Sequence, residues 1–275
     1  MTDAPPATAL GRIRDLWWDG FVECHAREGP ETTLDKLDVF MSDGRDRLQA
    51  MAQAHADASE SPSTPRHTLL VNQFLKSNTG KMFERFIALA LAYSLERVDS
   101  AYCVQPFRAK EIKNAPGLCR DDFKVTFKFG DGTLYTHIDA DVFAFNPNDR
   151  EAEVFMISVK STLKDRFHNV PFWNLLRRAA VSKDFPEVVA GNLAVLDRLR
   201  YVAVCSDLAA EQPDFGTDAG ARNLLQVDAS LLDGAYVTSS RARGLPNECT
   251  DSLGDIRAHA FFRYSCFYKV LAERT

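Results

Sequence analysis

The feature that most constrains this chain is a pair of apolar segments interrupted only by a few polar side chains. Val154 to Val159 is almost continuously apolar and rich in β-branched residues, which predicts a strand buried on both faces. A dense group of charged residues follows this segment, beginning at Lys160. The earlier segment, Ile138 to Phe145, is apolar except for Asp139 and Asp141. Together they predict two neighbouring strands of one sheet.

The polar residues of these two segments suggest a shared site. Side chains alternate between the faces of a strand, so Asp139 and Asp141 are expected on one face, as are Ser158 and Lys160. Carboxylates on one strand and a lysine on the next can hold a divalent cation beside a phosphate. A lone aspartate in such a segment is commonly just a residue at the end of a strand. A lysine that ends a strand is commonly just exposed to solvent. Buried carboxylates are rare unless they are paired or metal-bound, which favours a metal site.

These residues resemble the core of the PD-(D/E)XK nucleases. Ala140-Asp141 stands in the Pro-Asp place, Ser158 in the place of the usual acidic residue and Lys160 in the place of the lysine. The segment from Lys160 to Arg166 is similar to one shared by type II restriction endonucleases that read CCGG or CC-x-GG sites. EcoRII, NgoMIV, BsaWI and AgeI belong to that group, in which Ser-x-Lys replaces Glu-x-Lys. An AgeI-like enzyme is the closest resemblance.

The resemblance is tight over residues 137–166 and looser over about 70–210. It implies an α/β fold with a mixed β-sheet flanked by helices. The periodicity of the chain agrees with a mixed order of elements. We predict helices over 8–55 with a break at Gly29-Pro30, a loop over 57–66, a helix over 80–97, a hairpin over 124–138, a helix after Pro171, a helix over 186–199 and a strand over 201–205. The loop divides an N-terminal helical subdomain, 1–60, from a catalytic domain, 67–275.

Two aromatic clusters allow more than one interpretation. Trp17-Trp18 is expected to pack in a core, with base stacking as the alternative. The aromatic residues of 261–268 are likewise expected in a core, with a dimer interface as the alternative.

Composition limits the class of protein. A chain of 275 residues with 45% hydrophobic residues can bury a full core. Its longest apolar run, Phe86 to Tyr93, is too short to span a bilayer, and the N-terminus does not resemble a signal peptide. Six cysteines without a C-x-x-C pair indicate neither a zinc ribbon nor a disulfide framework. Thr79-Gly80-Lys81 lacks the rest of a phosphate loop, which argues against a nucleotide cofactor. We expect a reduced, cytoplasmic protein without a membrane partner.

The net charge of −5 conceals an uneven distribution that bears on nucleic-acid binding. Residues 1–62 hold twelve acidic against six basic side chains, whereas residues 160–183 hold six basic side chains and one acidic one. Positive charge therefore gathers around the expected site, where phosphates would lie. A charge run is commonly just a solvated face, so the distribution supports the site without establishing it.

The resemblance assigns roles at the expected site. Asp141 and the backbone carbonyl of Val159 would bind Mg²⁺, with Asp139 as the reserve ligand. Lys160 would orient or deprotonate the attacking water and steady the charge on the phosphate. His137 is an alternative base, although a lone strand histidine is more often structural.

One carboxylate of the pattern is missing. Since Ser158 replaces the usual acid, the look-alike enzymes supply a glutamate from the helix after the lysine strand. The corresponding positions here are Trp173 and Asn174. Those enzymes also bring a glutamate from an N-terminal helix with a Gly-x-x-x-Glu start, which Gly80 to Glu84 matches. Glu84 is therefore the expected second ligand.

Base recognition is expected from Lys164, Asp165 and Arg166. Arginine pairs with guanine and aspartate accepts from cytosine in the major groove. The alternative is a surface cluster of salt bridges.

We therefore expect a type II restriction endonuclease that binds double-stranded DNA as a homodimer and cuts a short palindrome with a CCGG core, such as ACCGGT, using Mg²⁺. The alternatives are a PD-(D/E)XK nuclease with a repair or structure-specific role, and a non-catalytic DNA-binding module.

Overall fold

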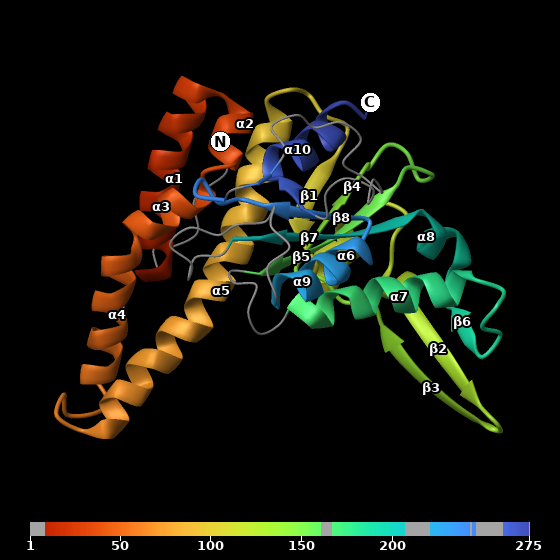
Figure 1. Cartoon of the computed structure of the whole chain (residues 1–275), viewed down its shortest axis with the longest axis horizontal. Helices are drawn as coiled ribbons and strands as arrows, with labels where there is room; N and C mark the ends of the chain where they lie inside the picture. Colours follow the sequence, from red (N-terminus) through yellow and green to blue (C-terminus); the bar gives the residue numbers. More distant parts are fainter. Residues whose placement is uncertain (1–8, 161–166, 207–220, 243, 246–260, 275) are drawn as a thin grey trace.

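The computed structural model describes residues 9–160, 167–206, 221–242, 244–245 and 261–274 (Figure 1). The helices are α1 (Ala9–Glu28), α2 (Pro30–Leu34), α3 (Leu37–Asp43), α4 (Arg45–Asp57), α5 (Pro65–Glu96), α6 (Ala109–Asn114), α7 (Val170–Val181), α8 (Leu193–Arg198), α9 (Ala221–Ser230) and α10 (Tyr264–Ala272), with 3-10 turns η1 (Arg120–Phe123) and η2 (Phe167–Asn169).

A mixed sheet forms the centre of the molecule, in the order β1-β4-β5-β7-β8-β9. Its strands are β1 (Cys103–Pro106), β4 (Val142–Phe145), β5 (Val154–Lys160), β7 (Leu199–Cys205), β8 (Gly234–Val237) and β9 (Phe262–Arg263). β1, β4 and β5 pair antiparallel, whereas β5, β7, β8 and β9 pair parallel. The predicted mixed α/β fold and the strands over 154–159 and 201–205 are confirmed.

Apolar side chains cover both faces of this sheet, which explains why β5 shows no polar alternation. Phe155, Ile157 and Val159 belong to a core shared with α5 and α10. Val154 and Met156 point the other way, into a core shared with α7. The predicted core placement of the 261–268 aromatics is confirmed, since each is buried: Phe261, Phe262, Tyr264, Phe267 and Tyr268.

The N-terminal helices pack onto α5 and share its core with the sheet. Trp17 is 3% exposed and its ring lies 5.8 Å from that of Phe86 on α5, so the predicted core placement of Trp17 is confirmed. The break at Gly29-Pro30 is also confirmed, because Gly29 adopts a φ of 83° and Pro30 begins α2. The predicted division between residues 60 and 67 falls at the turn that joins α4 to α5, and the two subdomains remain a prediction.

α5 is 32 residues long, so its predicted start at Gly80 is wrong. It begins instead after Thr64, whose hydroxyl caps the helix by accepting from the His67 amide at 3.2 Å. Its middle is made of weak helix formers: the Asn78 and Thr79 side chains each donate to a carbonyl one turn back, at 2.8 Å. A Cβ at Gly80 would meet no atom within 4 Å. Packing within the chain therefore does not require a glycine there.

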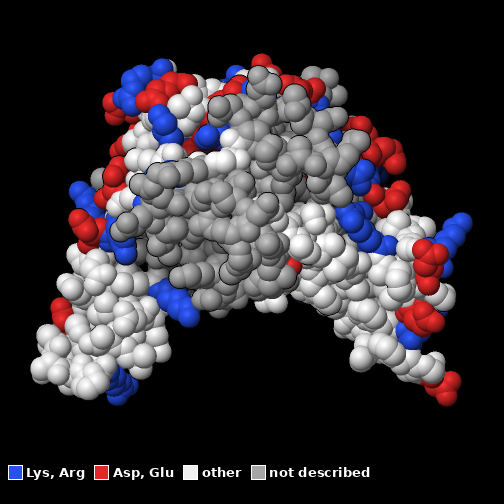
Figure 2. Space-filling model, in the orientation of Figure 1, with Lys and Arg blue, Asp and Glu red and all other residues white. Residues whose placement is uncertain are grey.

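A β-hairpin projects from the central sheet, as predicted. It consists of β2 (Lys124–Phe129) and β3 (Gly132–His137), joined by a two-residue turn in which Gly130 has a φ of 53°. β6 (Val188–Ala190) pairs with β2 and completes a second, three-stranded sheet. Figure 2 shows an arched outline, with the α4–α5 tip and this hairpin as its two arms and a hollow between them.

Three expectations from the sequence are wrong. The segment 138–145 is a strand only from Val142, because the chain crosses from the small sheet to the central one over residues 138–141. The predicted helix over 186–199 is β6 followed by α8, since Asn192 caps α8 by accepting from the Val195 amide at 3.3 Å. Cys266 is disulfide-bonded, whereas the sequence indicates no disulfide framework and a reduced protein.

Candidate active site

The backbone of Asp141 is fixed by the sheet, although the residue itself lies just before β4. Its amide donates to the Ile157 carbonyl of β5 at 3.1 Å, and its carbonyl accepts from the Phe107 amide after β1 at 3.0 Å. The β4–β5 register pairs Val142 with Ile157. Asp141 is therefore placed beside the last residues of β5, where Lys160 ends the strand.

The Asp141 carboxylate is the centre of the site. Its Oδ2 accepts from the Val159 amide at 2.6 Å, from Lys160 Nζ at 2.9 Å and from Ser158 Oγ at 3.3 Å. Lys160 Nζ also donates to the Val159 carbonyl at 3.1 Å. The structure thus brings together Asp141, Ser158, Val159 and Lys160, as the sequence analysis expects, and places an ammonium between the two predicted metal ligands.

Glu84, on α5, interacts electrostatically with this group. Its side chain is half-buried, and the loss of hydration raises its pKa, with a further increase from the negative charge of Asp141. Lys160, Arg108 and Lys81 act in the opposite direction. The Glu84 carboxylate therefore lies within electrostatic range of both Asp141 and Lys160.

Asp139 lies at the rim. Its side chain is exposed, yet partial desolvation raises its pKa, and the charge of Asp141 raises it further. The Tyr201 hydroxyl of β7 donates to the Asp139 carbonyl, which fixes the backbone there. Residues 139–141 lie outside the strand, so Asp139 and Asp141 do not share a strand face as predicted. The charge of Asp141 nevertheless raises the pKa of Asp139.

The donor set suits a hard divalent cation. Within the described residues, no three His, Cys, Asp or Glu side chains are grouped closely enough to bind a metal by themselves. Mg²⁺ does not need three, since it binds through one or two carboxylates and keeps several waters. Burial is the main cause of the raised pKa values of Glu84 and Asp139, and the negative charge of Asp141 adds a smaller increase that a bound cation would offset. Asp141, Glu84 and the Val159 carbonyl therefore fit Mg²⁺.

Three basic side chains near the carboxylates were not found from the sequence. Lys81 and Arg108 act on Glu84, and Arg120 acts on Asp139. Arg108 follows Phe107, whose amide is bonded to Asp141. All three are exposed and come from different elements, so no local pattern could have grouped them.

The helix that follows β5 offers no carboxylate. Asn174 is fully buried and points into the core, where its amide donates to the Leu231 carbonyl at 2.8 Å and its oxygen accepts from Arg177 Nε at 2.9 Å. Of the next acidic residues, Asp184 accepts from Ser182 Oγ at 2.9 Å, and Glu187 is exposed beside β6. These contacts account for Asn174 and Asp184 without a ligand role.

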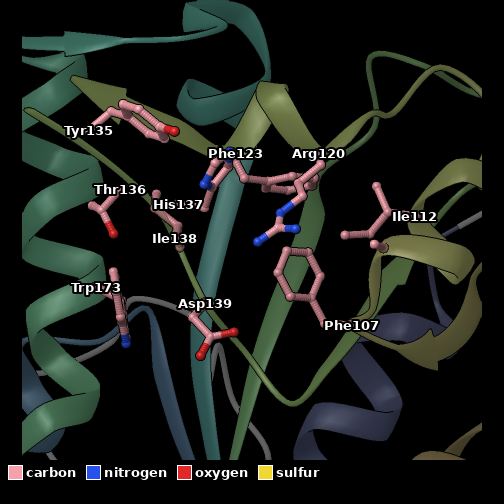
Figure 3. A pocket seen from close by; sticks show the side chains of 11 residues that line it. Phe107, Ile112, Arg120, Phe123, Tyr135, Thr136, His137, Ile138, Asp139 and Trp173 are labelled. Carbon is pink, nitrogen blue, oxygen red and sulfur yellow. The ribbon is translucent and has the colours of Figure 1, made fainter.

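A cavity of about 510 Å³ opens beside the carboxylates (Figure 3). Its aromatic walls are Phe107, Phe123, Tyr135 and Trp173. Arg120 points into it, and Asp139 lies at one end. His137 also lines it, with Nε2 3.5 Å from Asp121 Oδ1, a contact that fits the structural interpretation of this histidine.

The predicted base-reading residues Lys164, Asp165 and Arg166 lie outside the described residues, so their role remains a prediction.

Comparisons with known proteins identify the fold of the chain. No protein-family model and no curated protein matches the chain. Among solved structures, it is similar to the restriction endonuclease PspGI in a complex with substrate DNA, at 13% sequence identity and a TM-score of 0.50 over 95% of this chain and 92% of that one. The chain has a restriction-endonuclease fold. The restriction endonuclease BsaWI, in a pre-specific complex with DNA, also matches, at 13% identity and a TM-score of 0.34 over 97% and 91% of the two chains.

The restriction-endonuclease fold agrees with the resemblance seen in the sequence and spans nearly the whole chain. Within the part of the chain that the structure describes, no helix is long and apolar enough to cross a membrane.

Proposed function

We propose that this chain is a type II restriction endonuclease that makes Mg²⁺-dependent double-strand cuts at a short palindromic DNA site with a CCGG core, as an AgeI-like member of the CCGG-reading group. The observation that carries the proposal is the contact of Lys160 Nζ with both Asp141 Oδ2, at 2.9 Å, and the Val159 carbonyl, at 3.1 Å. The fold supports it, as does the resemblance of the segment that follows Lys160.

The residues divide the chemistry between them. Asp141, Glu84 and the Val159 carbonyl would hold Mg²⁺, which supplies a polarised phosphate and a more acidic water when bound. Asp141 also orients the Lys160 ammonium, which can then donate to a phosphate oxygen as negative charge develops. Lys81 and Arg108 act electrostatically on Glu84, and Arg120 acts on Asp139, so these positive charges would offset the repulsion that a DNA backbone would otherwise meet there.

A plasmid digest tests the proposal directly. Incubation with Mg²⁺ should yield discrete fragments whose ends map to one palindromic sequence, and chelation should stop the reaction. Cutting only at branched DNA, or without any preferred sequence, would favour a nuclease of another role. Binding without cutting would favour a DNA-binding module.

Substitution of Glu84 by glutamine should lower the single-turnover cleavage rate at least about tenfold, on the order of 1.4 kcal/mol of barrier, and raise the Mg²⁺ requirement. In the absence of metal, the same substitution should raise the free energy of unfolding. The pKa of Glu84 is raised in the folded chain, so ionised Glu84 destabilises the fold, and this cost appears as pH rises from the ordinary value of 4.5 through the raised value.

The measurements for Glu84→Gln are quench-flow rates over a Mg²⁺ series and urea unfolding over a pH series. The variant should lack the part of the stability decline that wild type shows above pH about 4.5. Asp139→Asn is the matched control at the rim. If Asp139→Asn is inactive while Glu84→Gln cuts like wild type, Asp139 is the second ligand.

Arg166→Ala and Asp165→Ala should each weaken specific DNA binding by roughly 1–3 kcal/mol, because each removes a contact to a base edge. Affinity for a scrambled duplex should change much less. Gel-shift titrations on both duplexes at one salt concentration measure the difference. An equal loss on both would make these residues phosphate contacts instead.

The working form should be a symmetric homodimer, because a palindrome presents the same half-site twice. The chain carries one Asp-…-Ser-x-Lys set, so cutting two strands requires two chains or two visits. Sedimentation with cognate duplex should give two chains per duplex. One chain per duplex throughout a complete double-strand cut would refute the dimer.

A further inference from the structure

The two faces of the β2–β3 hairpin differ in chemistry. One face is apolar and packs toward α7: Val125 is fully buried, and Phe127 contacts the same core. The register pairs Lys124 with His137, Thr126 with Tyr135 and Lys128 with Thr133, so these six side chains share the opposite face. We call this the polar face of the hairpin.

The polar face has the composition of a phosphate-contacting surface. Lysine, threonine and tyrosine commonly bind phosphate oxygens, and the strands β2 and β3 contain no acidic residue. The face also contains no Arg, Asn, Gln, Asp or Glu, the side chains that most often read base edges in pairs of hydrogen bonds. Lys124 Nζ lies 4.4 Å from the centre of the Tyr135 ring, a cation–π contact that holds the ammonium on this face.

The polar face is continuous with the candidate active site. Tyr135 and His137 line the cavity of about 510 Å³, which ends at Asp139 beside the carboxylates (Figure 3). Arg120 adds a positive charge along this path, whereas Asp121 is held near His137. The hairpin is also one arm of the arch in Figure 2.

We propose that the polar face of the hairpin binds the phosphate backbone of duplex DNA outside the recognition sequence, on the Asp139 side of the cut. This inference rests on the proposed function and extends it to the flanking DNA. The hairpin then adds affinity without sequence preference, and its contribution depends on salt and on the length of the flanks.

The test variant is Lys124→Gln/Lys128→Gln. The control variant is Lys36→Gln/Lys269→Gln, which makes the same change in net charge just before α3 and on α10, well away from the hairpin in Figure 1. Affinities are measured for specific and scrambled duplexes with long and short flanks, over a salt series. Thermal melting confirms that each variant is folded.

The hairpin variant should bind long-flanked duplexes roughly tenfold more weakly, equally for specific and scrambled sequences, and its salt slope should fall by about two. Shortening the flanks should cost wild type more affinity than it costs the variant. Lys128→Gln alone leaves the Lys124–Tyr135 contact intact and should lower the slope by about one.

Three results would overturn the inference while leaving the proposed function standing. The first is wild-type affinity and salt slope in the hairpin variant. The second is a loss confined to the specific duplex, which would make this face a base reader. The third is an equal loss in the control variant, which would reflect net charge alone. If wild type neither binds nor cuts any duplex, the proposed function itself fails.

Discussion

Lys160→Ala should slow DNA cleavage by roughly two to four orders of magnitude while leaving the fold and DNA binding intact. The substitution removes the ammonium that contacts both Asp141 and the Val159 carbonyl, the point at which charge would develop on the phosphate. Asp141→Ala should be equally inactive and should bind DNA at least as tightly as wild type, because it removes a negative charge that repels the backbone.

Single-turnover cleavage with excess enzyme and Mg²⁺ measures this effect, and gel shift on the same duplex separates binding from chemistry. Lys269→Ala serves as a control, since Lys269 pairs with Glu31 at 2.8 Å on the surface of α10. Normal turnover by Lys160→Ala would end the nuclease assignment.

Asp233→Ala should lower the free energy of unfolding by roughly 3–5 kcal/mol, as expected when one partner of a buried ion pair is removed. The Arg177 side chain is 7% exposed and lies 3.3 Å from the Asp233 carboxylate. Burial lowers the pKa of Arg177, which shows the cost of keeping this charge out of water. The same carboxylate accepts from the Tyr201 amide of β7 at 2.7 Å, so its loss also leaves a strand amide without its partner.

Arg178→Ala is the matched control, because Arg178 contacts the same carboxylate at 3.1 Å but is 47% exposed. An exposed pair of this kind contributes at most about 1 kcal/mol. Urea denaturation compares the two variants. Asp233→Ala with Arg177→Met should recover part of the lost stability, since no buried charge remains. Equal losses for Asp233→Ala and Arg178→Ala would contradict the burial argument.

Some parts of the fold and site could be predicted because their cause is local. β5 is apolar at successive positions because both of its faces are covered, and this pattern is visible without a structure. Lys160 follows directly from it as the residue that ends the strand. The two-residue turn at Gly130 is likewise specified by its own residues.

Other parts depend on contacts between distant segments. Residues 138–141 have the composition of a strand, but Ile138 donates to the carbonyl of Phe123, the residue before β2, and the chain then crosses to the central sheet. β6 exists because Val188 and its neighbours pair with β2, although their sequence also suits a helix. Lys81 and Arg108 influence Glu84, and Arg120 influences Asp139, although the three come from α5, the β1–α6 connection and η1, which are far apart in the sequence.

The length of α5 links two events that a shorter helix would keep separate. Its 32 residues span about 48 Å, from the tip of one arm of the arch to beyond Glu84. A rigid helix would carry any displacement of the tip to the Glu84 carboxylate. The segment of weak helix formers from Ser77 to Gly80 lies between them and would set how much of that displacement reaches Glu84. If the proposed function holds, contact of DNA with the tip of α5 and the position of the Glu84 carboxylate would be mechanically coupled, and the stiffness of this helix would set how strongly.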